Sequence, residues 1–136
     1  MGRDTVFIHI VFSTKYGHRD LTDEIIDSIS HYLKEQSVSK QVDIVELNGF
    51  ENHVHCLISC HESISLPDIV KWLKGSSSRW INQQTCFNHH FKWGVGYYAA
   101  RVHSTEFFTV VRYIQNQRIN HLKRNEKIDL GNMPAD

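Results

Sequence analysis

Residues 42–60 read VDIVELNGFENHVHCLISC, and their pattern predicts two strands. Apolar and polar residues alternate over 42–47, which predicts a strand. Asn48-Gly49 then marks a turn, and the apolar alternation of 53–60 predicts a second strand. The stretch as a whole therefore predicts an antiparallel hairpin.

The rest of the chain alternates between strand and helix patterns around this hairpin. Strands are expected over 6–13 and 97–102, and helices over 21–36, 66–82 and 104–124. Side chains suited to capping stand at the start of the first and last helices, namely Asp20 or Thr22 and Ser104 or Thr105. This order predicts an α+β fold of the ferredoxin-like (RRM-like) kind, an antiparallel sheet with helices on one face, plus a C-terminal helix.

The length of 136 residues favours a single domain over 1–136, with 83–96 as a loop or lid and 125–136 as a flexible tail. A hydrophobic content of 40% with 22% charged residues argues against a disordered chain. No apolar run approaches the roughly 20 residues that a membrane span needs. The first residues also lack the layout of a signal peptide, so a cytoplasmic protein is expected.

Charge is divided unevenly along a chain whose formal net charge is zero. Residues 20–62 carry nine acidic side chains against two lysines, whereas residues 69–124 carry nine basic side chains against one glutamate. Such asymmetry indicates contact with nucleic acid. An acidic helix beside basic solvent-facing surfaces would give the same distribution.

The cysteines exclude a disulfide framework, because there are only three of them. Cys56 and Cys60 fall in the apolar strand of the hairpin, where buried free thiols are expected. A zinc site would require a Cys-x-x-Cys pair or a distant partner pair, and the sequence has neither.

His53 and His55 stand two residues apart in the second strand of the hairpin, so their side chains project from the same face. The alternate positions of that strand are apolar and belong against the helices. The two histidines are therefore expected side by side on the open face, where they could give a divalent metal two imidazole nitrogens. Two ligands are too few for a stable site, and two surface histidines would produce the same pattern.

The final helix combines an apolar arc with two polar residues outside it. Tyr113 and Gln117 are expected one turn apart on the side opposite this arc. Arg118 falls inside the arc. Together with polar residues beside it, Arg118 supplies hydrogen-bond donors suited to phosphates and bases. The arc comprises Phe107, Phe108, Val111, Ile114, Ile119 and Leu122, and the donors are Arg112, Asn116, Arg118, Asn120 and His121.

These residue types together suit the cleavage of a DNA phosphodiester. A tyrosine hydroxyl can attack phosphorus and form a covalent phosphotyrosine, which keeps the bond energy for rejoining. A divalent metal held by His53 and His55 would polarise a phosphate oxygen. Gln117, one turn from Tyr113, is placed to be a third ligand.

Five motifs, spread over about residues 5–124, resemble the TnpA-type single-tyrosine HUH transposases of small bacterial insertion sequences. REP-associated tyrosine transposases are close relatives of that family. The motifs are HIVFSTKY (9–16), HVH (53–55), WLKGSSSRW (72–80), FKWGVGY (91–97) and RYIQNQ (112–117).

The resemblance implies a metal-dependent DNA transposase that acts as a homodimer on single-stranded DNA hairpins in a bacterium or archaeon. It implies Mg²⁺ or Mn²⁺ as the cofactor and a 5′-phosphotyrosine intermediate with a free 3′-OH. By motif match, Tyr113 is the nucleophile, and His53, His55 and Gln117 are the metal ligands. In the family the tyrosine helix can complete the partner subunit's site, which would account for a Tyr113 turned away from its own core.

One departure from the family pattern follows the Lys15-Tyr16 pair. A basic residue is usual there, whereas this chain has Gly17 and His18 before Arg19, which puts one DNA contact in doubt. Two alternatives remain open: a non-catalytic RRM-like nucleic-acid-binding protein, and a metalloenzyme that hydrolyses phosphodiesters with water.

Overall fold

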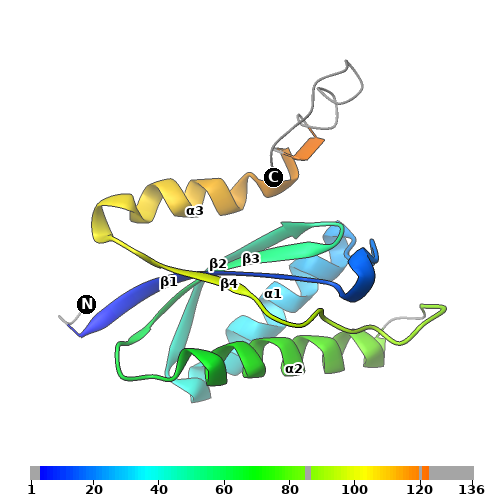
Figure 1. Cartoon of the computed structure of the whole chain (residues 1–136), viewed down its shortest axis with the longest axis horizontal. Helices are drawn as coiled ribbons and strands as arrows, with labels where there is room; N and C mark the ends of the chain where they lie inside the picture. Colours follow the sequence, from blue (N-terminus) through cyan, green and yellow to red (C-terminus); the bar gives the residue numbers. More distant parts are fainter. Residues whose placement is uncertain (1–3, 85–86, 120, 123–136) are drawn as a thin grey trace.

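Four strands form one antiparallel sheet in the order β2-β3-β1-β4 (Figure 1). The computed structural model describes residues 4–84, 87–119 and 121–122. The strands are β1 (Thr5–Ser13), β2 (Val42–Phe50), β3 (His53–His61) and β4 (Tyr98–Val102). Strand order and sense confirm the predicted ferredoxin-like architecture.

Helices cover both faces of this sheet (Figure 1). Helices α1 (Asp23–Ser37) and α2 (Leu66–Gln84) lie together on one face, and α3 (Phe107–Gln115) crosses the other. Short 3-10 turns are η1 (Lys15–Gly17), η2 (Val38–Lys40) and η3 (Ser104–Glu106). Thr22 caps α1, because its hydroxyl accepts a hydrogen bond from Ile25 N at 3.2 Å.

The larger core lies between the sheet and helices α1 and α2. Every second residue of β3 points into this core, as the period-two pattern predicts. Cys56 and Cys60 are buried free thiols there, and burial raises the pKa of Cys56 to about 12. The apolar β3 residues are Val54, Cys56, Ile58 and Cys60. No helix within the described ranges is long and apolar enough to cross a membrane.

The hairpin turns later than the sequence suggests. Asn48 and Gly49 belong to β2, and the reversal falls at Glu51 and Asn52, with Glu51 at a φ of 53°. Gly49 is needed for close packing rather than for a turn. A Cβ at this position would lie 2.9 Å from Val54 Cα and closer still to the His53 carbonyl oxygen.

We expect Gly49→Ala to destabilise the fold by about 1–3 kcal/mol, because the added methyl meets backbone that cannot move aside. Gly75→Ala is the matched control: nothing lies within 4 Å of a Cβ there, in the middle of α2. It should raise stability by about 0.5–1 kcal/mol through helix propensity. Urea unfolding of both variants checks this, and equal stabilities would contradict it.

The last predicted helix is shorter and begins differently. Residues 104–106 form η3, α3 ends at Gln115, Asn116 is a turn, and residues 117–119 and 121–122 are helical again. Neither Ser104 nor Thr105 caps α3; instead, the His103 side chain accepts a hydrogen bond from Thr105 N at the start of η3. Residues 120 and 123–124 and the predicted tail 125–136 lie outside the described residues.

Within the stretch predicted as a loop or lid (83–96), residues 83–84 belong to the end of α2, and residues 91–96 pack against that helix. Phe91 and Trp93 are buried, and Trp93 Nε1 donates to Ser77 Oγ at 2.9 Å. Lys74 Nζ donates to the carbonyl oxygens of Gly94 and Gly96 at 2.9 and 2.6 Å. The motifs WLKGSSSRW (72–80) and FKWGVGY (91–97) thus hold each other in place.

Candidate active site

The pairing of β1 with β3 gathers histidines on the sheet face opposite α1 and α2. Val11 pairs with His55 and Ser13 with His53, so His9, two residues before Val11, projects from that same face. His9 Nε2 lies 2.9 Å from His55 Nδ1. His9 is not among the residues predicted for the site, although its even spacing from Val11 in a neighbouring strand places it on the face that carries His53 and His55.

This face is not open, because α3 crosses it. A second apolar cluster joins α3 to the sheet, and the rings of Phe7 and Phe107 lie 4.7 Å apart within it. His55 is consequently only 8% exposed. The cluster comprises Phe7, Leu57, Val102 and Ile114, with Val45, Phe107, Val110 and Val111 packed against them.

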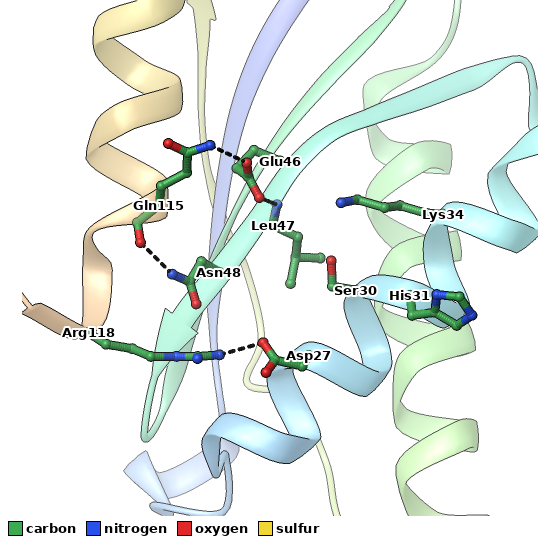
Figure 2. A pocket seen from close by; sticks show the side chains of 9 residues that line it. All are labelled: Asp27, Ser30, His31, Lys34, Glu46, Leu47, Asn48, Gln115 and Arg118. Carbon is green, nitrogen blue, oxygen red and sulfur yellow. Dashed lines mark hydrogen bonds and ion pairs between the residues drawn. The ribbon is translucent and has the colours of Figure 1, made fainter.

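The far end of α3 is tied to β2 and α1 by polar contacts around a pocket of about 420 Å³ (Figure 2). Asn48 Nδ2 donates to the Gln115 carbonyl oxygen, and Gln115 Nε2 donates to Glu46 Oε2, both at 3.0 Å. Arg118 pairs with Asp27 at 2.8 Å. Arg118 therefore leaves the apolar arc to bind α1. Each exposed pair adds little alone, but together they hold the end of α3 and the residues after it against β2 and α1.

Tyr113 faces the sheet of its own chain, contrary to the prediction. Its ring lies 5.5 Å from the His55 ring and 6.3 Å from the His9 ring, and the residue is 41% exposed. The predicted apolar arc was displaced, since Phe108, Ile119 and Leu122 of that arc are exposed. The residues that meet the sheet are Phe107, Val110, Val111 and Ile114, and Tyr113 borders this stripe.

Gln117 is fully buried rather than turned outward. Its Nε2 donates to the Tyr113 carbonyl oxygen at 3.2 Å, and its Oε1 lies 3.2 Å from His121 Nε2. The same His121 atom lies 3.1 Å from His53 Nε2. One imidazole nitrogen thus contacts two of the three predicted ligands. His121 is predicted above only as a donor to phosphates or bases, although its i+4 spacing from Gln117 places it on the same side.

Burial keeps the central imidazoles neutral. Burial, together with the neighbouring His9, His53 and His121, lowers the pKa of His55 to about 3. The pKa of His9 is also lowered by burial. Neutral imidazole is the form that binds metal ions. His53 Nδ1 lies 3.0 Å from Asn52 Oδ1, a contact that orients the ring and leaves Nε2 toward His121.

A sequence profile of the family described as "Transposase IS200 like" matches residues 3–117. The chain belongs to the IS200-like transposase family. It is 31% identical over 71 residues to the ISDra2 transposase TnpA of Deinococcus radiodurans, a match covering 52% of this chain and 51% of that protein. It is 29% identical over 100 residues to the IS200 transposase of Salmonella typhimurium, covering 69% of this chain and 65% of that one. The matched stretches thus span about half to two thirds of these relatives.

Solved structures agree on the fold of this IS200-like chain. A Deinococcus radiodurans R1 protein assigned as a transposase superposes with a TM-score of 0.65 at 26% identity, covering 86% of this chain and 96% of that one. A REP-associated tyrosine transposase bound to a REP hairpin gives a TM-score of 0.64 at 12% identity, covering 85% and 68%. At that identity the second likeness speaks for the fold alone.

The neutral state of His55 makes folding sensitive to acid. Its folded pKa of about 3 lies below the unfolded value of 6.5, so between these values the unfolded chain binds the extra proton. The free energy of unfolding should therefore fall as pH drops through this window, by at most about 1.4 kcal/mol per pH unit from this group. Urea unfolding from pH 7 to 4 measures it. His55→Asn should flatten the slope, and an unchanged slope would contradict this assignment.

Proposed function

We propose that this chain cleaves and rejoins single-stranded DNA, with Tyr113 as the nucleophile that becomes joined to the 5′-phosphate. The observation that carries the proposal is the position of the Tyr113 ring, 5.5 Å from the buried, neutral His55 and still 41% exposed. A nucleophile must be reachable by its substrate and also stand beside the groups that stabilise phosphoryl charge. Membership in the IS200-like transposase family supports the same chemistry.

The reaction exchanges one phosphoester for another. The Tyr113 oxygen bonds to phosphorus, the bond from phosphorus to the 3′-oxygen breaks, and the tyrosine proton ends on the released 3′-OH. The product is a 5′-phosphotyrosine with a free 3′-OH. Attack by a 3′-OH on the phosphotyrosine reverses these bond changes and restores Tyr113. No external energy source is required, because the number of phosphoester bonds is constant.

His53, His55 and Gln117 would hold a divalent cation, Mg²⁺ or Mn²⁺. The donor set fits, since His55 is neutral and His53 Nε2 and Gln117 Oε1 converge on one point occupied by His121 Nε2. When bound, such a cation neutralises charge on the phosphoryl oxygens. Gln117 also donates to the Tyr113 carbonyl oxygen, which keeps the nucleophile and this ligand one turn apart.

DNA hairpins are the proposed substrate. The 12%-identical structural neighbour is bound to a REP hairpin. In this chain, Arg101 on β4 and Arg112 on α3 are exposed basic residues available to phosphates. A mobile insertion sequence and a domesticated relative would use the same chemistry, in the cytoplasm of a bacterium or archaeon.

A second copy of the chain is the proposed partner in a homodimer. Exposed apolar residues in the C-terminal segment that carries Tyr113 support a partner surface, namely Phe108 at 75%, Ile119 at 53% and Leu122 at 54%. The non-catalytic RRM-like alternative is less well supported, because α3 covers the sheet face on which such proteins stack bases.

Tyr98 provides a matched control for the nucleophile. Its ring lies 6.2 Å from the His9 ring, close to the 6.3 Å of Tyr113, and it is more exposed at 58%. Wild type, Tyr113→Phe and Tyr98→Phe are incubated with labelled hairpin DNA and Mg²⁺ or Mn²⁺ and run on a denaturing protein gel. We expect a covalent band with wild type and Tyr98→Phe. Tyr113→Phe, or EDTA, should reduce it at least about 1,000-fold, as for loss of a nucleophile.

Each alternative has its own outcome in this assay. A band that survives in Tyr113→Phe and disappears in Tyr98→Phe would overturn the assignment of the nucleophile. Cleavage without any covalent band in wild type would mean that water attacks. Binding without cleavage, over hairpins taken from the flanks of the gene, would support the non-catalytic alternative.

A further inference from the structure

We propose a second metal site, built from His18, Asp20 and His89, that binds a late transition metal of the zinc class. It is separate from the His53, His55 and Gln117 set, and no step of the proposed DNA chemistry uses it. Within the described ranges these three residues form a group whose ligand atoms all lie within 4.8 Å of one another. The inference goes beyond the proposed function.

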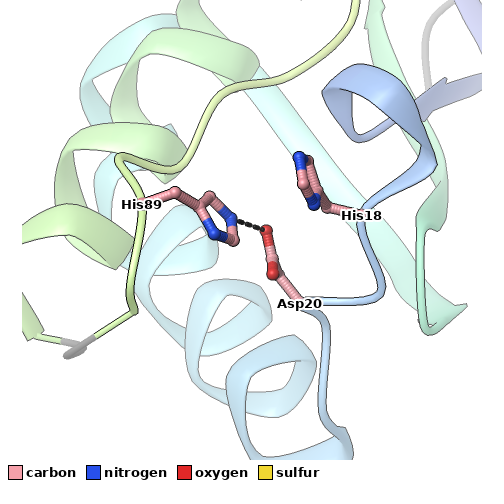
Figure 3. A group of neighbouring side chains, drawn as sticks. All are labelled: His18, Asp20 and His89. Carbon is pink, nitrogen blue, oxygen red and sulfur yellow. Dashed lines mark hydrogen bonds and ion pairs between the residues drawn. The ribbon is translucent and has the colours of Figure 1, made fainter.

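The three side chains converge from two segments that are distant in sequence (Figure 3). His18 and Asp20 lie between η1 and α1, whereas His89 follows α2. His89 Nε2 lies 2.8 Å from Asp20 Oδ2. The His18 and His89 rings stack with centroids 4.4 Å apart and planes 23° apart. A shared cation requires the rings to tilt toward each other, which exposed side chains can do without moving backbone.

The backbone on both sides of the group is fixed by hydrogen bonds. Thr14 Oγ1 donates to the His18 carbonyl oxygen at 2.7 Å, and Leu21 N donates to the Glu51 carbonyl oxygen at 2.8 Å. On the other segment, Phe91 N donates to Asn82 Oδ1 at 2.8 Å, and Asn82 Nδ2 donates back to the Phe91 carbonyl oxygen at 3.0 Å. The donors are therefore held near each other before any ion binds, which lowers the entropic cost of binding.

The donor chemistry selects the class of metal. Two imidazole nitrogens and one carboxylate oxygen suit Zn²⁺, Co²⁺ or Ni²⁺, with a water in the fourth position. Mg²⁺ and Ca²⁺ prefer oxygen ligands and would bind poorly. The Asp20 side chain is only 11% exposed, so its charge is screened little by water and favours a cation strongly.

The proposed metal site lies beside a pocket, and a bound ion would change how firmly the walls of that pocket are held. A pocket of about 250 Å³ beside it is lined by the three donors together with Lys15, Tyr16, His90 and Lys92. A bound ion would join the segment after β1 to the segment after α2 and so fix two walls of this pocket. We therefore expect metal binding to raise the melting temperature of the wild type.

Co²⁺ titration followed by the visible absorption of the bound ion tests the proposal without DNA. His18→Gln is the main variant, because His18 is exposed and outside both cores. It should weaken one binding event more than about tenfold, a loss seen even for outer-shell partners of metals. His31→Gln, at an exposed position on α1, is the matched control and should bind as wild type does. His53→Gln should instead remove the binding of Co²⁺ at the His53, His55 and Gln117 set.

The proposal is overturned if His18→Gln and His89→Gln, folded by circular dichroism, bind Co²⁺ with the stoichiometry and affinity of wild type. The Asp20–His89 contact would then be an ion pair only. The proposed DNA chemistry is tested separately, because the covalent band depends on Tyr113 and the cobalt titration does not. Either claim can therefore fail while the other stands.

Discussion

The antiparallel pairing of β1 with β3 is the constraint on which the candidate site depends. This register places His9, His53 and His55 on one face and sends the alternate apolar residues, such as Ile10 and Val54, toward α1 and α2. Because side chains alternate along a strand, a slip of one residue would bury the histidines among the helices. The fold and the site are therefore specified by the same register.

Helix α3 covers this face of the sheet, so that the histidines lie in a partly buried site. Its apolar stripe packs on Phe7 and Leu57 at one end, and the ties from Gln115 and Arg118 hold the other end. Between them, burial and the neighbouring histidines lower the pKa of His55 to about 3 and keep it neutral, while Tyr113 at the border of the stripe remains partly exposed. The desolvation that makes the imidazoles available as ligands also makes the fold sensitive to acid.

The sequence predicts those features that depend on local periodicity. Period-two alternation correctly separated the two faces of β3, and the element order gave the ferredoxin-like sheet. Tertiary contacts decided the rest. Gly49 looked like a turn residue, but the close approach of Val54 explains it. The break at Asn116 and the sheet-facing stripe of α3 could not be read from one helical pattern, so Gln117 was expected outside and is buried. Asp20 and His89 meet across 69 residues, which no local motif reveals.

We propose that Tyr113, among five tyrosines, is the residue that joins to DNA. Proteolysis of the wild-type covalent product, followed by mass spectrometry of the peptide that carries nucleotide, tests it most directly. We expect a nucleotide linked through its 5′-phosphate to Tyr113 and to no other residue. Attachment at Tyr98, or a cleaved DNA with no modified tyrosine, would contradict it.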